Sequence, residues 1–172
     1  MVAIDQKRNK KEKSDNCRGF TLIELIITLT IIVIVASIAV VSFQRLAVNS
    51  SIKTAARDVA SDIALYKERA IAESRMYRIS LDVNSGTYNI QQCGATGSSC
   101  ASWDPNPIQV KNLARFASDI TFDSNITTAT HLFFQTRGTV TNRTIGLRNG
   151  RGSTATITIN ITGRTNVKFN LQ

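Results

Sequence analysis

Residues 20 to 85 of the 172-residue chain contain neither glycine nor proline, the two residues that most often interrupt a helix. Apolar side chains recur at steps of three and four residues through the second half of this stretch, at Ile52, Ala56, Val59, Ile63, Tyr66 and Ala70. This spacing is typical of an amphipathic helix. We therefore expect one helix of about 55 residues, from Phe20 to about Ser74, with a length of roughly 80 Å.

The first half of the predicted helix is strongly apolar. The polar residues between Phe20 and Val41 are Thr21, Glu24, Thr28, Thr30 and Ser37. About 20 residues suffice for a helix to cross a bilayer, so residues 20–41 predict a membrane span, with the basic head of residues 1–18 in the cytoplasm. A carboxylate within such a run costs up to ~2.5–3.5 kcal/mol at a bilayer centre, which indicates that Glu24 has a function.

Two processing events are compatible with this segment. An ordinary signal peptide would be cut after Ala39, because Ser37-Ile38-Ala39 resembles a small-x-small site. The apolar run is longer than the usual core of about 7–15 residues in such a peptide. The other event is a cut between Gly19 and Phe20, which leaves the new amine four residues from Glu24. In a helix bundle Glu24 would then pair with the amine of a neighbouring copy and fix the register of assembly.

The segment from Arg18 to Leu25 reads R-G-F-T-L-I-E-L and leads into the apolar helix. It resembles the prepilin (class III) signal of type IV pilins and type II secretion pseudopilins. The resemblance implies that a prepilin peptidase cleaves after Gly19 and methylates Phe20, and that Glu24 is the assembly glutamate. It also implies a removed cytoplasmic leader over 1–19, an inner-membrane and assembly half of the helix over 20–43, an amphipathic half over 44–75, and a periplasmic domain over 76–172.

Alternating apolar residues after the helix predict a β-rich domain. Residues 77–83 and 87–92 are expected to form a hairpin around Asn84-Ser85-Gly86. An irregular insert follows over 93–107, and further strands are expected at 108–113, 119–123, His131–Thr136, Thr139–Leu147, Thr154–Ile161 and Asn166–Leu171. The predicted fold class is α+β, a long N-terminal helix packed against an antiparallel β-domain, as in pilins.

Cys93 and Cys100 bracket the short loop C-G-A-T-G-S-S-C. No histidine lies near them in the sequence, so a disulfide in an oxidising compartment is a better interpretation than a metal site.

Two later segments resemble the GspH/FimT family of minor pseudopilins and minor pilins. Phe133 to Val140, F-F-Q-T-R-G-T-V, is similar to the family's F-x-x-R-G segment, and Gly163-Arg164 lies where the family often has a Gly-Arg hairpin. Membership implies two small sheets against the helix. It also implies a non-enzymatic subunit of a type IV pilus or type II secretion filament, with other pilin-like subunits as partners. The subunit would start as a single-pass inner-membrane protein and end in a surface pilus or periplasmic pseudopilus.

The chain has no acidic residue after Ser124 but six basic ones, Arg137, Arg143, Arg148, Arg151, Arg164 and Lys168. FimT-type members in DNA-uptake systems are associated with DNA binding through a C-terminal G-R-x-R element. The stretch that resembles it here is Gly163-Arg164-Thr165-Asn166, in which Asn166 takes the place of the second arginine. A DNA-binding tip pilin is therefore the alternative function, with sequence-independent contacts to phosphates. A solvated basic face, or an acidic groove on a partner subunit, would explain the same residues. If the last four strands form a meander, Arg137 and Arg164 share one end, and Arg151 lies at the other, near Arg143 or Arg148.

No catalytic, cofactor or metal motif is recognisable in the sequence, and no small-molecule substrate is expected. His131 is the only histidine and starts an apolar strand, so it is interpreted as structural. Asp58 and Asp62 stand one helical turn apart and are interpreted as a solvated helix face.

Overall fold

The computed structural model describes residues 20–172 and divides the chain into two compact units, before and after the boundary between Val41 and Ser42. Each unit is described by itself. Gly19 and the rest of the predicted leader lie outside the described residues.

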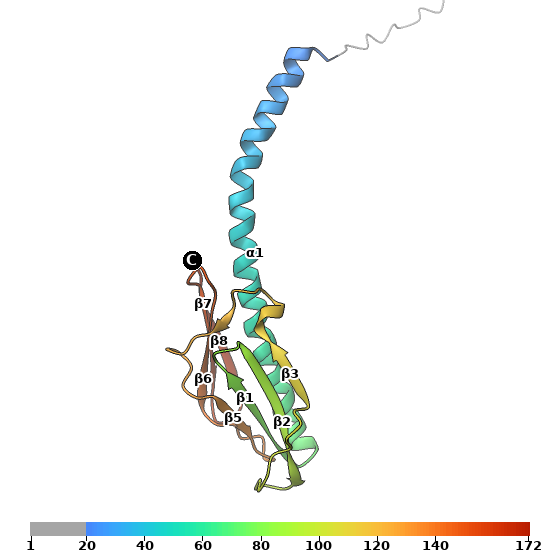
Figure 1. Cartoon of the computed structure of the whole chain (residues 1–172), viewed down its shortest axis with the longest axis vertical. Helices are drawn as coiled ribbons and strands as arrows, with labels where there is room; N and C mark the ends of the chain where they lie inside the picture. The colour runs from blue at the N-terminus through green and yellow to red at the C-terminus, as the bar shows by residue number, and fades with distance from the viewer. Residues whose placement is uncertain (1–19) are drawn as a thin grey trace, which may run out of the picture. The chain divides into compact units, whose positions relative to one another are not determined.

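Helix α1 runs from Leu22 to Ala72, which confirms the long helix that the sequence predicts (Figure 1). Thr21 caps its first turn, because the Glu24 N–H donates to Thr21 Oγ1 at 3.3 Å. At the other end Ser74 adopts a left-handed conformation, with φ of 47°, and its carbonyl accepts from the Gly97 N–H at 2.8 Å. Within residues 20–172, no helix combines the length and the apolar character needed to cross a membrane.

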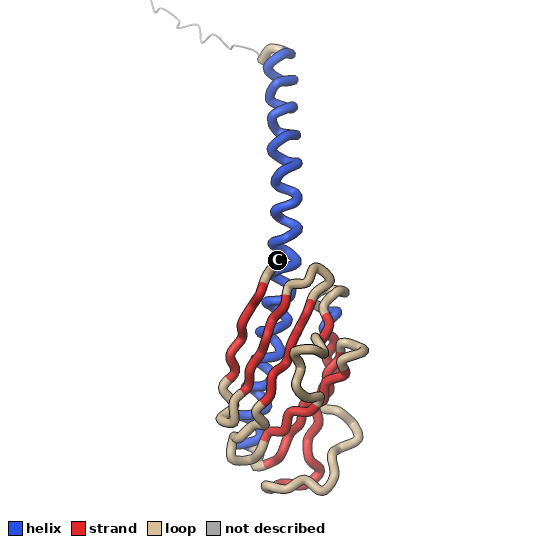
Figure 2. Tube along the Cα trace, turned by 90° about the vertical axis from the view of Figure 1, so that its left-hand side faces the viewer, coloured by secondary structure: helices blue, strands red, loops and turns tan. Residues whose placement is uncertain are grey.

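Two antiparallel sheets of four strands follow the helix, and both run beside its second half in Figure 2. The first sheet has the order β3-β2-β1-β5, formed by β1 (Arg75–Asp82), β2 (Thr87–Thr96), β3 (Gln109–Asn112) and β5 (His131–Phe134). The second sheet has the order β4-β6-β7-β8, formed by β4 (Thr121–Phe122), β6 (Arg143–Arg148), β7 (Thr154–Ile159) and β8 (Thr165–Asn170). A 3-10 turn, Leu113–Arg115, follows β3. The predicted α+β class with two small sheets is confirmed.

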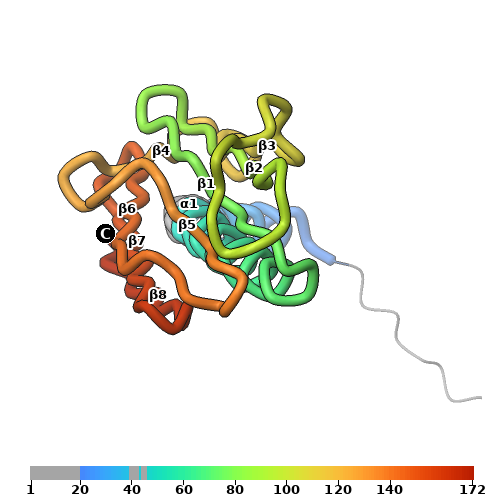
Figure 3. Tube along the Cα trace, turned by 90° about the horizontal axis from the view of Figure 1, so that it is seen from below, coloured from blue at the N-terminus to red at the C-terminus, as the bar shows by residue number. Residues whose placement is uncertain are grey.

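The hydrophobic core lies between the helix and the two sheets, which surround the helix on different sides when viewed along it (Figure 3). The predicted apolar stripe of the helix is at most 2% exposed at every position from Ile52 to Ala70. It meets inward residues of the first sheet, such as Ile79 and Ile90, and of the second, such as Ile145 and Ile157. Three alanines on this stripe, Ala55, Ala56 and Ala70, are fully buried.

The last four strands do not form the single meander that the sequence suggests. β5 pairs with β1 in the first sheet, with Phe134 opposite Tyr77 and Leu132 opposite Ile79. Both β5 side chains are fully buried there, so core burial outweighs the local preference for a hairpin with the next strand. Of these last four strands, β6, β7 and β8 form a meander and β5 does not belong to it.

The segment between β5 and β6 crosses from one sheet to the other, so β6 begins at Arg143 rather than at Thr139. Its backbone is bonded to β5 of the first sheet and to the β7–β8 turn of the second. The Thr141 N–H donates to Phe133 O at 3.2 Å, and the Val140 N–H donates to Ile161 O at 3.0 Å.

Candidate assembly and interaction sites

The first part of helix α1 exposes apolar side chains around its whole circumference. The large apolar residues from Phe20 to Ile38 are 48% to 77% exposed, and Glu24 is the one charged residue among them. A helix that is hydrophobic all round is normally covered by another apolar phase or by other helices. This part of the chain therefore has a surface suited to contact with another apolar phase or with other helices.

Thr21 is the N-cap of this helix, a local role that the sequence analysis missed. Thr21 and Glu24 form the pattern T-x-x-E, the signature of a capping box, with Thr21 as N-cap and Glu24 at the third helical position. A carboxylate there also lies near the positive end of the helix dipole. The structure shows the Thr21 half of this box, the bond from the Glu24 N–H to Thr21 Oγ1, and the role of the Glu24 carboxylate in assembly stays a prediction from the sequence.

Asp58 and Asp62 are not the solvated pair that the sequence suggests. Lys111 Nζ lies 3.1 Å from Asp58 Oδ2 and 2.6 Å from Asp62 Oδ2, and Arg115 Nη2 lies 2.8 Å from Asp58 Oδ2. The Tyr88 hydroxyl donates to Asp62 Oδ2 at 2.7 Å. We call these five residues the charge network.

The charge network joins helix α1 to the edge of the first sheet. The side chains of Asp62 and Lys111 are only 8% and 10% exposed. Burial, and then the hydrogen bond to Asp62, raise the pKa of Tyr88 well above its ordinary value. The helical spacing of the two aspartates was visible in the sequence, but their cation lies about fifty positions further along the chain.

The insert after β2 is organised by a disulfide between Cys93 and Cys100. Cys93 forms an isolated bridge with Trp103, and the Gly94 N–H donates to Ser102 O at 3.1 Å. These bonds fold residues 102–104 back along the end of β2, where the Arg78 guanidinium lies 4.7 Å from the centre of the Trp103 ring. The insert that the sequence treats as irregular therefore begins as strand, since β2 continues to Thr96.

Two glycine turns bring three of the predicted basic residues to one end of the second sheet. Gly138 and Gly163 have φ of +80° and +75°, and a Cβ on either would lie within 3.6 Å of Lys67. The side chain of Lys67 thus contacts both turns, which places the neighbouring Arg137 and Arg164 at the same end. Arg143 joins them, because it pairs with Ile159 at the base of the β7–β8 turn. We call Arg137, Arg143 and Arg164 the basic end.

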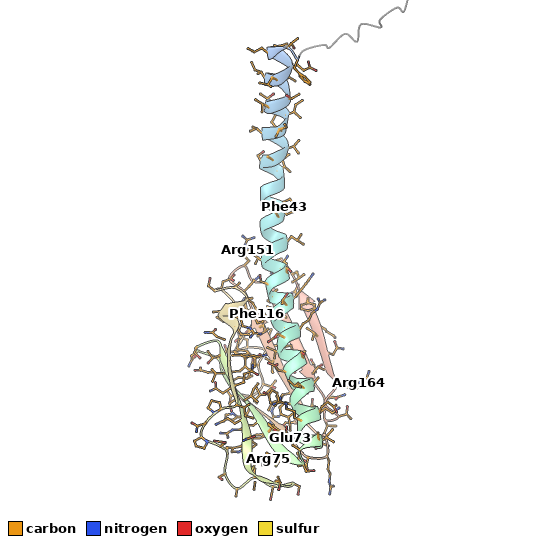
Figure 4. The ribbon with its side chains drawn as sticks, turned by 90° about the vertical axis from the view of Figure 1, so that its right-hand side faces the viewer. Phe43, Glu73, Arg75, Phe116, Arg151 and Arg164 are labelled. Carbon is orange, nitrogen blue, oxygen red and sulfur yellow. A yellow bond between two sulfur atoms is a disulfide. The ribbon has the colours of Figure 1, made fainter. Side chains whose placement is uncertain are left out.

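The other basic residues lie elsewhere. Arg148 pairs with Thr154 beside the turn that carries Arg151, and Lys168 pairs with Thr156 in mid-strand. Figure 4 shows Arg151 and Arg164 at opposite ends of the second sheet. The sequence-based placement of Arg137, Arg151 and Arg164 thus agrees with the structure, and Arg151 is near Arg148 rather than Arg143.

Within residues 20–172 no group of three or more His, Cys, Asp or Glu is arranged to hold a metal ion. His131 Nδ1 lies 3.0 Å from Ser80 Oγ on the outer face of the first sheet. Asp82 Oδ1 accepts the Asn84 and Ser85 N–H groups and closes the β1–β2 turn.

Comparison with known proteins agrees with this arrangement. A family model for the prokaryotic N-terminal methylation motif matches residues 14–40, and a model described as type II transport protein GspH matches residues 55–163. No curated protein matches the chain.

Two solved structures share the fold. The minor pseudopilin EpsH from the type II secretion system of Vibrio cholerae is 18% identical, with a TM-score of 0.53 over 69% of this chain and 97% of that chain. The type IV minor pilin FimU of Pseudomonas aeruginosa is 20% identical, with a TM-score of 0.52 over 69% of this chain and 89% of that chain. Since the GspH model covers more than half of the sequence, this chain belongs to the GspH family of pilin-like proteins.

Proposed function

We propose that this protein is a minor pilin or pseudopilin, a non-enzymatic structural subunit of a type IV pilus or type II secretion filament in the cell envelope. The single observation that carries this proposal is the ring of exposed apolar side chains between Phe20 and Ile38. Burying such surface is worth roughly 25 cal/mol per Å², so packing against the equivalent helices of other subunits would strongly favour assembly. The disulfide supports an oxidising location, the periplasm, for the β-domain.

Processing is part of the proposal. A prepilin peptidase would cleave between Gly19 and Phe20 and methylate the new amine, within the stretch that the methylation motif covers. The mass of the mature N-terminus tests this step directly. A methylated Phe20 supports the proposal, whereas a start at Val40 contradicts it and leaves an ordinary secreted protein.

In the assembled filament, the Glu24 carboxylate would pair with the Phe20 amine of a neighbouring subunit. Buried charges are tolerated when each meets its opposite, so this pair would fix the register of the helices. The proposal predicts that the charge of Glu24, and not merely its hydrogen-bonding capacity at the helix terminus, is needed for incorporation.

Two variants separate these roles. Glu24→Gln keeps the hydrogen-bonding pattern of a capping box but removes the charge, while Thr21→Val removes the N-cap and keeps the charge. We expect Glu24→Gln to be processed normally but recovered with partner subunits at least about tenfold less, since a buried pair that loses one partner is strongly destabilised. Thr21→Val should stay within about twofold of wild type, since one cap is worth about 1 kcal/mol. Normal recovery of Glu24→Gln would contradict the pairing.

The alternative, a tip pilin that binds DNA, receives less support. A nucleic-acid track needs several cations along one path, because affinity grows with the number of neutralised phosphates. The six basic residues are divided between the two ends and the middle of the second sheet. This division favours the structural function.

A further inference from the structure

The basic end displays cations on a rigid backbone. Asn160 Oδ1 accepts the Arg164 N–H at 2.9 Å and the Thr162 hydroxyl at 2.8 Å, which fixes the β7–β8 turn. The turn at Gly138 closes through a bond from its N–H to Gln135 O at 2.9 Å. The backbone of these two turns therefore loses little conformational freedom when a partner binds.

Among the described residues, none of the three arginines of the basic end forms an ion pair. The two carboxylates at the nearby end of helix α1 are already engaged. Glu68 Oε1 lies 3.7 Å from Lys67 Nζ, and the Glu73 carboxylate accepts a hydrogen bond from the Tyr77 hydroxyl. The positive charge of the basic end is therefore left for a group outside these residues.

Arg143 gives a more specific indication. Its Nε is buried and has no hydrogen-bond partner in the part of the chain that the structure describes, and its Nη1 donates only to the Asn142 carbonyl, at 3.1 Å. A buried cationic donor without an acceptor is costly, and such groups in native proteins normally have a partner. A carboxylate suits the fork of a guanidinium, so an acidic group of a partner would find a matching donor at the outer nitrogens of this side chain.

A pocket of about 440 Å³ lies beside Asn142. It is lined by the hydroxyl and amide side chains of Gln135, Thr139, Thr141 and Asn142, together with Val140 and Ile161. Ile161 is 65% exposed although it follows a strand with a buried face. Neutral donors, one exposed aliphatic side chain and flanking arginines together suit a peptide segment that carries both acidic and aliphatic residues.

We infer that the basic end and this pocket bind an acidic segment of a partner subunit, through a contact separate from the helix. The inference rests on the proposed function, since it assumes that neighbouring subunits present such a segment. A protein partner is favoured over nucleic acid because the pocket offers an aliphatic surface and because the remaining cations lie away from it, which leaves no long track for phosphates.

The test measures binding to the full-length protein in detergent by fluorescence anisotropy at ~20 mM salt, where screening is weak. The probes are a labelled hexapeptide of glutamate and isoleucine, its glutamine counterpart, and a 12-base-pair DNA duplex. The variant is Arg137→Gln with Arg164→Gln. The control is Arg148→Gln with Arg151→Gln, which removes the same charge from the opposite end of the second sheet.

We expect the acidic peptide to bind and the glutamine peptide not to bind. The basic-end variant should lose about tenfold or more in affinity for the acidic peptide and the control less than about twofold, because charge-assisted hydrogen bonds act at short range. A fourth probe, labelled hexaglutamate, isolates the aliphatic contact: Ile161→Ser should weaken binding of the glutamate and isoleucine peptide by about threefold and leave binding of hexaglutamate unchanged.

Three results would overturn the inference. The first is that the acidic peptide does not bind, and the second is that the two double variants lose equal affinity for it. The third result is that DNA binds more tightly than the peptide and that the basic-end variant loses affinity for DNA. The last would identify a nucleic-acid site. Glu24→Gln should bind the peptide like wild type. If the peptide does not bind but incorporation into the filament is normal and depends on Glu24, this inference alone is rejected. If incorporation does not depend on Glu24, the assembly role proposed for Glu24 is rejected instead.

Discussion

The two sheets of the domain use charge in opposite ways. At the edge of the first sheet, Lys111 and Arg115 are paired with two aspartates of helix α1, and the pairs are largely buried. Strands β6, β7 and β8 of the second sheet contain no acidic residue, and their arginines form no ion pair among the described residues. Charge in the first sheet therefore contributes to holding the fold, whereas charge in the second is available to a partner.

The most direct way to break this comparison is to remove one lysine from each sheet. Lys111→Met keeps most of the side-chain volume but leaves two carboxylates one helical turn apart without their shared cation. We expect it to lower the free energy of unfolding by about 3–5 kcal/mol, the usual cost of losing one partner of a buried pair. Lys168→Met removes an exposed lysine from mid-strand β8, and should change stability by less than about 0.5 kcal/mol.

Urea unfolding of both variants gives the two values under the same conditions. Small and equal changes would mean that the charge network contributes no more to stability than a surface lysine. A large loss in Lys168→Met would mean that β8 depends on a contact outside the described residues.

A second comparison concerns packing, with one strand glycine from each sheet. Gly146 in β6 lies beneath Ile126, and a Cβ there would approach Ile126 Cβ to 2.5 Å. Gly146→Ala should therefore cost about 1–3 kcal/mol, because two chain segments must move apart. Gly94→Ala in β2 is the control, since its Cβ would find its nearest neighbour at an ordinary 3.7 Å.

Thermal unfolding of these two variants sharpens the comparison between sheets. If Gly146→Ala lowers the melting temperature and Gly94→Ala does not, the loop over residues 123–128 is closely packed against the second sheet. Equal melting temperatures would mean that this loop yields easily, and that close packing there contributes little to stability.

The sequence predicts the parts of this fold that depend on local periodicity. The length of helix α1, its apolar stripe and the β1–β2 hairpin follow from spacing within a few residues. The position of β5 does not, because it depends on Tyr77 and Ile79, which lie more than fifty residues earlier in the chain. The charge network was missed for the same reason.

Some features of the candidate sites could likewise be recognised from local sequence, whereas others depend on contacts between distant parts of the chain. The apolar segment with Glu24 was recognisable from residues 20–41, and the capping signal at Thr21 was present there but overlooked. The basic residues were recognisable as a set, but only the turns packed against Lys67 determine which three lie together. The burial of the Arg143 Nε, which has no hydrogen-bond partner among residues 20–172, has no signal in the sequence.

The smallest expected effect is a loss of stability at alkaline pH. It should differ between the two sheets, because all three tyrosines belong to helix α1 or the first sheet. Burial, and then the hydrogen bond to Glu73, raise the pKa of Tyr77 from 10.0 to about 12. The folded state therefore holds this proton more tightly than the unfolded state does. The resulting stabilisation is complete below pH 10 and is lost as the pH rises from 10 through 12.

Tyr77→Phe should cost about 1 kcal/mol at pH 7, where one hydrogen bond is lost. Between pH 10 and 12 its stability should fall less steeply than that of wild type, since one of the raised tyrosines no longer titrates. Urea unfolding across this range measures the two slopes, and hydrogen exchange at pH 11 should show the first sheet losing protection before the second. Parallel slopes would mean that Tyr77 titrates alike in the folded and unfolded states, and equal loss of protection would mean that alkaline instability is not confined to the sheet that contains β1 and β2.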